Sequence, residues 1–407
     1  ESNDGVLMTG MVIPELSINF AGASRMKCSA QVIYRMEEKE KGVHCGLAIL
    51  DMDINAYTHL TDILINALDP NGYVSNEIDM DDLWEFFFNS GFIYPKKYEL
   101  IKAYREDFKK TYQKLYKLES PEIVKHFTYQ KNGRIYGHLS MIRAYERSWL
   151  IQHHASRAME GKRAGFMVLR QIVYFMNDVR RLPSPKVKYL ICHYRPDNKF
   201  PDRVFGGFAR SLNNSGGCSM DLFSYLYFIN PSVNTKLPEG WLLSACSELD
   251  LWELNRFYSY YSNGLLLNSL CMGQNNSGNN ALTSLYDKVG LKRRYKEYSL
   301  SFNGELNAVL IVDQSDLGLN LSEFLNAIKV LVTNPEGLPW DILSIAIARL
   351  ATLYKKMTKV PILIYPMEYV NKKSVVYEKE YQIWILDLDY GSEFVEYMET
   401  RFRVSYK

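Results

Sequence analysis

Alternating and periodic apolar positions predict a β-rich N-terminal segment, residues 1–78. Residues 12–20 largely alternate between apolar and polar side chains, as a strand with one buried face does. Two further strands are expected at 30–35 and 43–50, on either side of a charged hairpin connection. A helix is expected at 55–68, because its apolar residues recur at helical spacing before an Asp-Pro-Asn-Gly stop.

From residue 79 onward, longer helices are interleaved with strands. Apolar residues at helical spacing predict helices at 81–89, 98–116, 166–180 and 200–211. Apolar runs and alternation predict strands at 127–130, 134–145, 148–154, 187–193 and 222–228. Asn132-Gly133, between the first two of these strands, is a signal for a tight hairpin turn. The mixture predicts an α+β fold.

The same order of signals returns in the second half of the chain. Three motifs recur at offsets of 168, 171 and 173 residues: Leu83-Trp84-Glu85 at Leu251-Trp252-Glu253, Asn132-Gly133 at Asn303-Gly304, and the strand at Leu190-Ile191 at Leu363-Ile364. Each match alone is short, but chance matches need not be collinear. We therefore predict two modules of similar plan, 79–235 and 236–407, joined by a Pro- and Gly-containing stretch at 230–240.

Composition narrows the class of protein. The 407 residues are 47% hydrophobic and 23% charged, which excludes a wholly disordered chain. With 48 Lys and Arg against 46 Asp and Glu, the net charge of +2 argues against a strongly basic nucleic-acid-binding protein. No apolar run approaches the ~18 residues of a membrane span, and the N-terminus lacks the plan of a signal peptide. The chain begins with Glu1 rather than Met, which leaves room for an upstream segment.

The cysteines form neither a disulfide framework nor a zinc pattern. Six Cys are scattered without a Cys-x-x-Cys pair. We therefore expect a reduced, cytoplasmic protein that holds no metal ion. Cys218, which follows Ser215-Gly216-Gly217, is expected in the core, because a cysteine nucleophile needs a lowered pKa and no sequence feature indicates one.

The element order of each module resembles the GNAT (acyl-CoA N-acyltransferase) fold. A helix pair, a run of antiparallel strands, a helix, a strand, a helix and a final strand follow one another in turn. The resemblance implies a mixed sheet whose strand before the central helix splays from its neighbour. It also implies that this strand holds the pantetheine arm of acyl-CoA, while the next loop and helix N-terminus hold the pyrophosphate. The implied reaction moves an acyl group from a thioester donor to an amine acceptor.

The stretch that matches the family's donor loop lies between the strand at 148–154 and the helix at 166–180. The resemblance implies that six residues bind the cofactor acyl-CoA: Arg157, Gly161, Lys162, Arg163, Ala164 and Gly165. Two glycines and three cations at a helix start suit an anionic ligand. The family signature places Gln or Arg three positions before the first Gly, whereas here the spacing is four. The alternative interpretation is a solvated loop at the helix entry.

Polar residues at two strand ends are candidates for the chemistry. Neutral His153 or His154 can take a proton from an ammonium nucleophile near pH 7, and adjacent strand residues face opposite sides. The resemblance implies that Tyr194 protonates a leaving thiolate. Arg195 and Asp197 are the substrate-binding candidates, since Arg195 can hold a carboxylate or phosphate at a strand's C-terminal edge. The alternatives are one exposed and one packed histidine, and a capped loop after the strand.

Two other stretches bear on the function. Residues 330–340, equivalent to the donor loop, have no cation and two Pro, so the second module is interpreted as degenerate or structural. Tandem modules with one working half also resemble FemABX-type aminoacyl transferases, which implies a tRNA-dependent alternative. The cations of residues 98–117 form a solvated helix face or, alternatively, a surface for an acidic partner or nucleic acid.

The N-terminal segment resembles the second half of a PilZ domain, a small β-barrel that in many bacterial proteins senses cyclic di-GMP. The matching stretches are 10–14, the strand up to Phe20, 30–35 and 44–47. The family's Arg-x-x-x-Arg arm and Asp/Asn-x-Ser-x-x-Gly turn are absent from this chain, so we expect no cyclic di-GMP binding. A three-stranded fragment alone would expose its edges, so we expect it to dock on the first module.

The leading hypothesis is therefore a bacterial, PilZ-linked tandem GNAT-like acyltransferase that uses a small-molecule thioester donor and an amine acceptor. The alternative is a non-catalytic signalling or scaffold protein that keeps the fold. A gap between the strands at 148–154 and 187–193 would favour the enzyme, and a continuous ladder there would argue against it.

Overall fold

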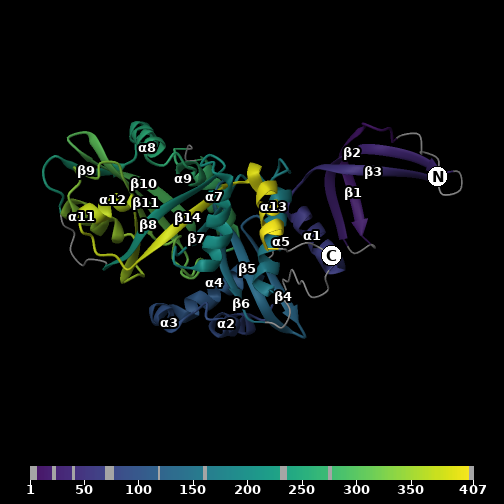
Figure 1. Ribbon diagram of the computed structural model, residues 1–407, viewed down its shortest axis with the longest axis horizontal. Helices are drawn as coiled ribbons and strands as arrows, with labels where there is room; N and C mark the ends of the chain where they lie inside the picture. The colour runs from purple at the N-terminus through teal and green to yellow at the C-terminus, as the bar shows by residue number, and fades with distance from the viewer. Residues whose placement is uncertain are drawn as a thin grey trace.

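The computed structural model describes residues 7–20, 24–38, 42–68, 78–117, 120–158, 163–229, 236–273 and 277–402. These ranges form an eleven-stranded mixed sheet, covered by helices, and a separate three-stranded antiparallel sheet. Figure 1 shows the small sheet set apart at one end of the molecule, next to α1 (Ile54–Leu68). The architecture is α+β, as predicted.

The small sheet contains β1 (Val12–Phe20), β2 (Ser24–Glu38) and β3 (Gly42–Met52), in that order across the sheet. All its pairings are antiparallel, and α1 follows β3 directly. The three predicted strands and the predicted helix are confirmed. The described residues form this small open sheet and not the barrel that the PilZ resemblance implied.

The N-terminal segment docks on the first module, as predicted. The Tyr57 hydroxyl of α1 donates to Asp178 Oδ2 of α5 (Ala164–Val179) at 3.2 Å. Asp62 of α1 forms an ion pair of 2.7 Å with the buried Lys125 of the large sheet. An ion pair with one buried partner places two surfaces more firmly than an exposed pair does. Helix α1 therefore anchors the small sheet to the rest of the molecule.

The large sheet runs through both predicted modules without a break. In order across the sheet, its strands are β4 (Val124–Lys131), β5 (Arg134–Tyr145), β6 (Ser148–Ser156), β7 (Tyr189–Tyr194), β14 (Lys379–Asp387), β8 (Cys218–Ile229), β13 (Lys359–Tyr365), β12 (Ile328–Val332), β11 (Glu305–Ser315), β10 (Arg293–Phe302) and β9 (Trp241–Ala245). Pairs β6–β7 and β12–β13 are parallel, and the others are antiparallel.

The two halves exchange their last strands. Strand β14, from the end of the chain, lies between β7 and β8, with Ile385 opposite Ile191. Strand β8, the last of the first half, pairs with β13 of the second half. The C-terminal α13 (Gly391–Phe402) packs on α5 of the first half, as Figure 1 shows. The halves therefore share one sheet, and the boundary at 235/236 stays a prediction.

The internal repeat is visible in matching elements. Both predicted Asn-Gly turns have positive φ at both residues, 52° and 72° at Asn132 and Gly133, and 50° and 87° at Asn303 and Gly304. Such turns follow the twist of a β-hairpin, and each joins two antiparallel strands. In each half a parallel strand pair flanks a helix, α5 in the first and α11 (Trp340–Ala351) in the second.

Helices cover both faces of the large sheet. Besides α1, α5, α11 and α13 they are α2 (Met80–Asn89), α3 (Pro95–Ile101), α4 (Arg105–Lys117), α6 (Lys199–Pro201), α7 (Gly207–Leu212), α8 (Glu248–Tyr261), α9 (Leu266–Ser269), α10 (Ser277–Lys288) and α12 (Met367–Lys372), with short 3₁₀ or π segments at Lys102–Tyr104, Asp202–Gly206 and Leu388–Tyr390. The predicted helices at 98–116 and 200–211 are each interrupted by one of these segments. In the described ranges no helix is both long and apolar enough to cross a membrane.

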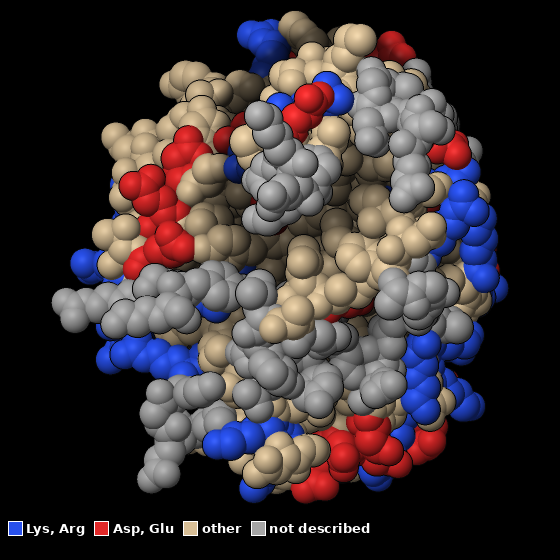
Figure 2. All heavy atoms as spheres, turned by 90° about the vertical axis from the view of Figure 1, so that its right-hand side faces the viewer, with Lys and Arg blue, Asp and Glu red and all other residues tan. Residues whose placement is uncertain are grey.

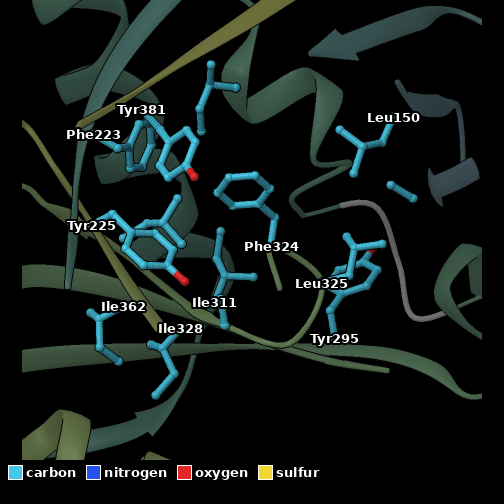
Figure 3. Close-up of a cluster of buried hydrophobic side chains, with 14 of the residues drawn as sticks. Leu150, Phe223, Tyr225, Tyr295, Ile311, Phe324, Leu325, Ile328, Ile362 and Tyr381 are labelled. Carbon is cyan, nitrogen blue, oxygen red and sulfur yellow. The ribbon is translucent and has the colours of Figure 1, made fainter. Parts of the chain in front are cut away.

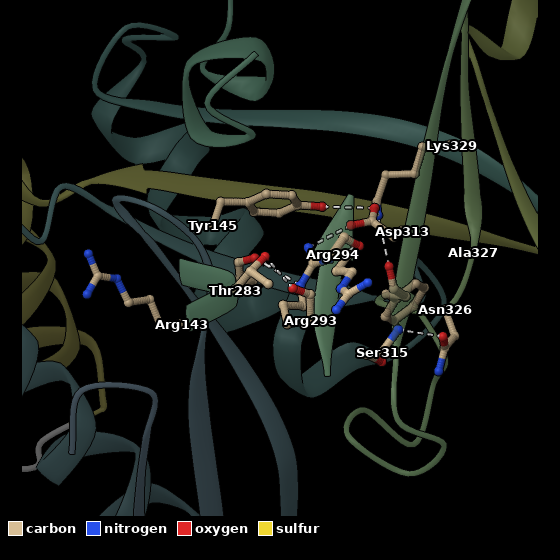
Figure 4. A network of polar contacts seen from close by, with 12 residues as sticks. Arg143, Tyr145, Thr283, Arg293, Arg294, Asp313, Ser315, Asn326, Ala327 and Lys329 are labelled. Atoms are coloured by element: carbon tan, nitrogen blue, oxygen red, sulfur yellow. Dashed lines mark hydrogen bonds and ion pairs between the residues drawn. The ribbon is translucent and has the colours of Figure 1, made fainter. Parts of the chain in front are cut away.

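A buried ion-pair network ties the two halves together (Figure 4). Asp313 of β11 pairs with Arg293 of β10 at 2.6 Å and with Lys329 of β12. The Tyr145 hydroxyl of β5 donates to Asp313 Oδ2 at 3.1 Å, and Arg293 Nε donates to the Ala144 carbonyl at 3.1 Å. Because Asp313 and Arg293 are fully buried, each charge depends on its partners.

Charges on the surface are mixed in sign. Figure 2 shows the end of the molecule that carries the N-terminal sheet, where basic and acidic side chains of the described residues both appear around the rim. Neither sign dominates this face, in keeping with the net charge of +2.

Candidate functional site

A cavity opens in the large sheet where the β6–β7 ladder stops. The parallel pairing runs from Ser148 opposite Tyr189 to Ile151 opposite Cys192 and goes no further. Both strands continue, β6 to Ser156 and β7 to Tyr194. Residues 151–158 and 192–195 line a cavity of about 820 Å³, which lies in the range of small-molecule sites. The two strands thus separate where the resemblance implied a splay, and a role of this gap in donor binding stays a prediction.

A bulge in β6 accompanies the separation. His153 has a φ of 53°, and the register between β5 and β6 shifts between His138 and Ser140. A bulge bends a strand and increases its local twist. This bend accounts for the end of β6 leaving β7 while it stays paired with β5.

The second half has no such gap at the equivalent strands. Strand β12 pairs with β13 from Ile328 opposite Ile362 to Leu331 opposite Tyr365, where β13 ends. Pro335 and Pro339 follow and lack backbone donors. The interpretation of this half as degenerate or structural stays a prediction.

The N-terminus of α5 forms one end of the cavity. Arg163 precedes the helix, and Arg163, Ala164 and Gly165 all line the cavity. A Cβ at Gly165 would lie 2.9 Å from Ser156 Oγ, and a Cβ at Gly137 would lie 2.9 Å from the Ala164 carbonyl oxygen. Both glycines therefore allow the helix start to approach the strands closely. The positive end of the helix dipole suits an anionic group at this place.

The predicted donor loop is only partly described. Arg157, Arg163, Ala164 and Gly165 line the cavity, whereas Gly161 and Lys162 lie outside the described residues. The Arg157 guanidinium lies 5.2 Å from the Phe86 ring centroid. Its buried Nε has no hydrogen-bond partner among the residues that the structure describes. These cations stand where the resemblance places the donor's phosphates.

His153 is buried and has contacts at both ring nitrogens. Its Nδ1 lies 2.5 Å from the Tyr116 hydroxyl, and its Nε2 accepts from the Leu321 backbone N–H at 3.3 Å. Burial, with His138 nearby, holds the pKa of His153 well below its usual value. The contacts are typical of a packed, neutral histidine, and a catalytic role for His153 stays a prediction.

His154 has a different environment. Its Nε2 donates to the Gly165 carbonyl at 2.9 Å, which leaves Nδ1 as the acceptor of the neutral ring. Burial lowers the pKa of His154 to about 4. The side chain lines the cavity beside the start of α5, so it is a neutral group near physiological pH.

Tyr194 and Arg195 line the cavity from the β7 side. The Tyr194 hydroxyl donates to Asp202 Oδ1 at 3.4 Å, and burial followed by the Asp202 charge raises the pKa of Tyr194. The hydroxyl therefore stays protonated at physiological pH. Arg195 forms an exposed ion pair with the predicted substrate-binding residue Asp197.

Neither Cys192 nor Cys218 offers an activated nucleophile. Cys192 lines the cavity, but burial raises its pKa, so the unreactive thiol form dominates near neutral pH. Cys218 is buried in the core, as predicted. Among the described residues, no three His, Cys, Asp or Glu side chains come together in a metal-binding arrangement.

The second half supplies part of the cavity wall, which the sequence analysis missed. Residues 320–324, between β11 and β12, line the cavity of the first half. Asn320 Nδ2 donates to Gln152 Oε1 at 2.9 Å, and the Phe324 ring stacks on His193 with centroids 4.2 Å apart. Figure 3 shows Phe324 pointing toward Tyr225 and Tyr381. The interpretation of this half as degenerate or structural is therefore incomplete.

Three ionisable side chains meet at the cavity that the sequence did not predict as site residues. Lys97 of α3, Glu323 and Lys379 of β14 line it, and the Tyr227 hydroxyl donates to Glu323 Oε2 at 3.4 Å. Burial raises the pKa of Glu323 to about 7, against the opposing effects of Tyr227 and the two lysines. Burial and then the Lys379 charge lower the pKa of Lys97 to about 8. No sequence motif connects these residues, because they come from distant parts of the chain.

Comparison with known proteins found likenesses among solved structures. No protein-family model matches the sequence, and no curated protein matches it. A tandem GNAT protein from the clavulanic acid biosynthesis pathway, without AcCoA, is 11% identical with a TM-score of 0.33, covering 71% of this chain and 95% of that chain. A GCN5-related N-acetyltransferase from Sphaerobacter thermophilus is 9% identical with a TM-score of 0.37. The match covers 76% of this chain and 94% of that chain. A putative acetyltransferase from Pyrococcus horikoshii is 12% identical with a TM-score of 0.36. The match covers 76% of this chain and 86% of that chain. The function proposed below therefore rests on the cavity itself.

Proposed function

We propose that the protein is an N-acyltransferase that moves an acyl group from acyl-CoA, or another thioester, to an amine. The observation that carries the proposal is the gap between β6 and β7, which ends at the N-terminus of α5. Backbone groups along an unpaired strand edge can hydrogen-bond the amides of an extended pantetheine arm. Cations and a helix N-terminus can hold a pyrophosphate.

The predicted donor residues take roles in this proposal. Arg157, Gly161, Lys162, Arg163, Ala164 and Gly165 would hold the phosphates, with Arg157 and Arg163 supplying charge and the helix start supplying N–H groups. The unpaired edge of β6 beyond Ile151 would hold the pantetheine arm. In this arrangement the thioester would lie between β6 and β7.

The remaining candidates would act at the thioester. Tyr194, protonated at physiological pH, would give a proton to the leaving thiolate from the β7 side of the gap. His154 would serve as a neutral hydrogen-bonding group at the α5 end, while His153 would support the wall. Arg195 and Asp197 would contact the substrate at the cavity mouth.

A thermal-shift titration with CoA and acetyl-CoA tests the proposal. We expect both ligands to raise the unfolding temperature of the wild-type chain at millimolar concentration. The charge reversal Arg163→Glu should abolish the shift, because it places an anion beside the donor's phosphates. Arg134→Glu, on the exposed end of β5 and outside the cavity wall, is the matched control. If neither ligand stabilises the wild type, or if both variants respond alike, the proposed function is wrong.

A non-catalytic signalling or scaffold role is the second candidate. The observation that favours it is the four-residue spacing from Arg157 to Gly161, which departs from the donor signature of the resembled family. A third candidate, tRNA-dependent aminoacyl transfer, requires tRNA retention that fades as salt rises. For the PilZ-like segment, we expect no binding heat in a calorimetric titration of cyclic di-GMP into the chain. Measurable binding would support a nucleotide-sensing role instead.

A further inference from the structure

The cavity has a second charged region, made of Glu323, Lys97 and Lys379, whose residues come from three separate elements. Glu323 lies between β11 and β12, Lys97 on α3 and Lys379 on β14. All three line the cavity and interact electrostatically with one another. None of these three side chains contacts the donor in the acyl-CoA site proposed above.

The backbone around Glu323 holds its side chain in place. Glu323 has a φ of 59°, a conformation that non-glycine residues adopt rarely and that is often found at functional sites. Its N–H donates to the Asn320 carbonyl at 2.9 Å, and its carbonyl accepts from Asn326 N–H at 2.8 Å. Lys329, part of the buried Asp313 network, donates to the Phe324 carbonyl at 2.8 Å. The core of the second half therefore fixes this loop against the cavity.

Aromatic side chains surround the two lysines. Lys97 Nζ lies 4.3 Å from the Phe92 ring centroid, and Lys379 Nζ lies 4.6 Å from that of Tyr225. Aromatic faces stabilise the ammonium groups and also offer apolar surface to a ligand. This end of the cavity thus combines two cations, one carboxylate and apolar walls.

We propose that this region is the acceptor subsite and that the acceptor is an amine that carries a carboxylate, such as an α-amino acid. Its ammonium group would lie at Glu323 and its carboxylate at Lys97 and Lys379. Glu323 would act as the general base, so the second half supplies a catalytic residue to the first. The assignment of the base rests on the proposed acyl transfer, whereas the binding of an amino acid does not.

The charge pattern discriminates between classes of amine. A plain amine can pair with Glu323 but brings no anionic group for the two lysines that line the same region. An amino acid brings both signs and matches the pattern group by group. Burial, and then the Lys379 charge, lowers the pKa of Lys97, and an acceptor carboxylate would relieve the repulsion between the two lysines.

The transfer step balances in atoms and charge. Ionised Glu323 takes one proton from the acceptor's ammonium, and the free amine attacks the thioester carbonyl carbon. A C–N bond forms and the C–S bond breaks, with its electron pair leaving on sulfur. The nitrogen's second proton ends on the thiolate, with Tyr194 as relay, and the proton on Glu323 passes to water. The products are an amide, a thiol and one proton.

Ligand-observed NMR titrations of the whole chain without donor test the subsite. The probes are three matched pairs: alanine and ethylamine, leucine and 3-methylbutylamine, and phenylalanine and phenethylamine. We expect at least one amino acid to bind at least about 10-fold more tightly than its amine, about 1.4 kcal/mol. Lys97→Met and Lys379→Met should each remove most of this preference, whereas Lys102→Met, on an exposed residue outside the cavity wall, should keep it.

Thiol release from acetyl-CoA with the same six probes separates this inference from the proposed function. If donor turnover occurs but plain amines react as well as the amino acids, the inference is wrong and the acyltransferase proposal stands. If amino acids bind through the two lysines but acetyl-CoA neither binds nor turns over, the acyltransferase proposal is wrong and the subsite stands. If no amino acid is preferred in the NMR titration and acetyl-CoA neither binds nor turns over, the inference and the acyltransferase proposal are both wrong.

Discussion

At the scale of single residues, the sequence identified residues of the proposed donor side of the cavity and missed those of the proposed acceptor side. Arg157 and Arg163 stood out because they lie six positions apart in one short stretch before a helix start. Glu323 and Lys379 carry no local signal, because only the folded sheet brings them to Lys97. His153 was a candidate by its place on a strand, and its packing against Tyr116 depends on long-range contacts that sequence spacing does not encode.

The role of Glu323 as a base predicts a narrow bell-shaped pH profile of kcat/KM. Glu323 must be ionised to take a proton, so the rate should rise as pH passes about 7. Lys97 must be charged to hold the acceptor carboxylate, so the rate should fall as pH passes about 8. Among the described residues, the charged and titratable groups that interact with Glu323 are Lys97 on α3, Lys379 on β14, and Tyr225 and Tyr227 on β8.

Substitution separates the two limbs of this profile. Glu323→Gln should lower kcat by about 100-fold or more and remove the acid limb, the size typical for loss of a general base. Lys97→Met should remove the alkaline limb and mainly raise KM. The control, Glu305→Gln on the exposed start of β11, should leave the profile unchanged. A wild-type rate that is flat between pH 6 and 9 would contradict the assignment.

The close approach of the α5 start to the strands predicts a stability effect. Gly137→Ala would place a Cβ 2.9 Å from the Ala164 carbonyl oxygen, so the helix start must shift. We expect a loss of about 1–3 kcal/mol in urea unfolding and weaker acyl-CoA binding. Gly216→Ala is the control, because its Cβ would meet its nearest neighbour at 3.4 Å. Equal stability of the two variants would show that the helix start is not held as described.

At the scale of elements, apolar periodicity predicted most strands and helices, since each strand or helix needs a buried face of its own. The Asn-Gly turns were predictable because their chemistry is local. The gap between β6 and β7 was predicted only through the resemblance, and its physical cause, the bulge at His153, has no clear sequence signal. The interruptions near Lys102 and Asp202 were also missed, because helical spacing continues across them.

The Asp313 network is predicted to hold the cavity loop as well as the two halves. Asp313→Asn would leave Arg293 and Lys329 buried without their carboxylate. We expect a loss of about 3–5 kcal/mol in unfolding free energy, as for other broken buried pairs. Breaking the exposed pair of Glu336 and Lys372 by Glu336→Gln should change little. A near-neutral Asp313→Asn variant would refute a structural role for the network.

At the scale of the whole molecule, the repeat was visible in the sequence but the strand exchange was not. Collinear motifs revealed two similar halves, since each motif is local. The placement of β14 beside β7, and of β8 beside β13, depends on pairings between residues far apart in the chain. Sequence patterns predict that a strand forms, but they do not identify its neighbours.

The exchange predicts that the two halves unfold together. A fragment of residues 79–235 would lack β14 and α13, which leaves an edge of β7 unpaired and a face of α5 bare. We expect one cooperative calorimetric transition for the sheet of the whole chain and no cooperative transition for the fragment. Two independent transitions, or a stably folded fragment, would show that the halves are separate domains.

The central claim is that a thioester donor lies along the free edge of β6. Hydrogen–deuterium exchange of the whole chain, with and without saturating CoA, tests it most directly, because exchange reports protection of individual backbone segments. We predict that CoA slows exchange in peptides covering residues 152–157 and 163–166, while peptides covering 328–332 stay unchanged. Unchanged exchange at 152–157 under CoA saturation would contradict the account.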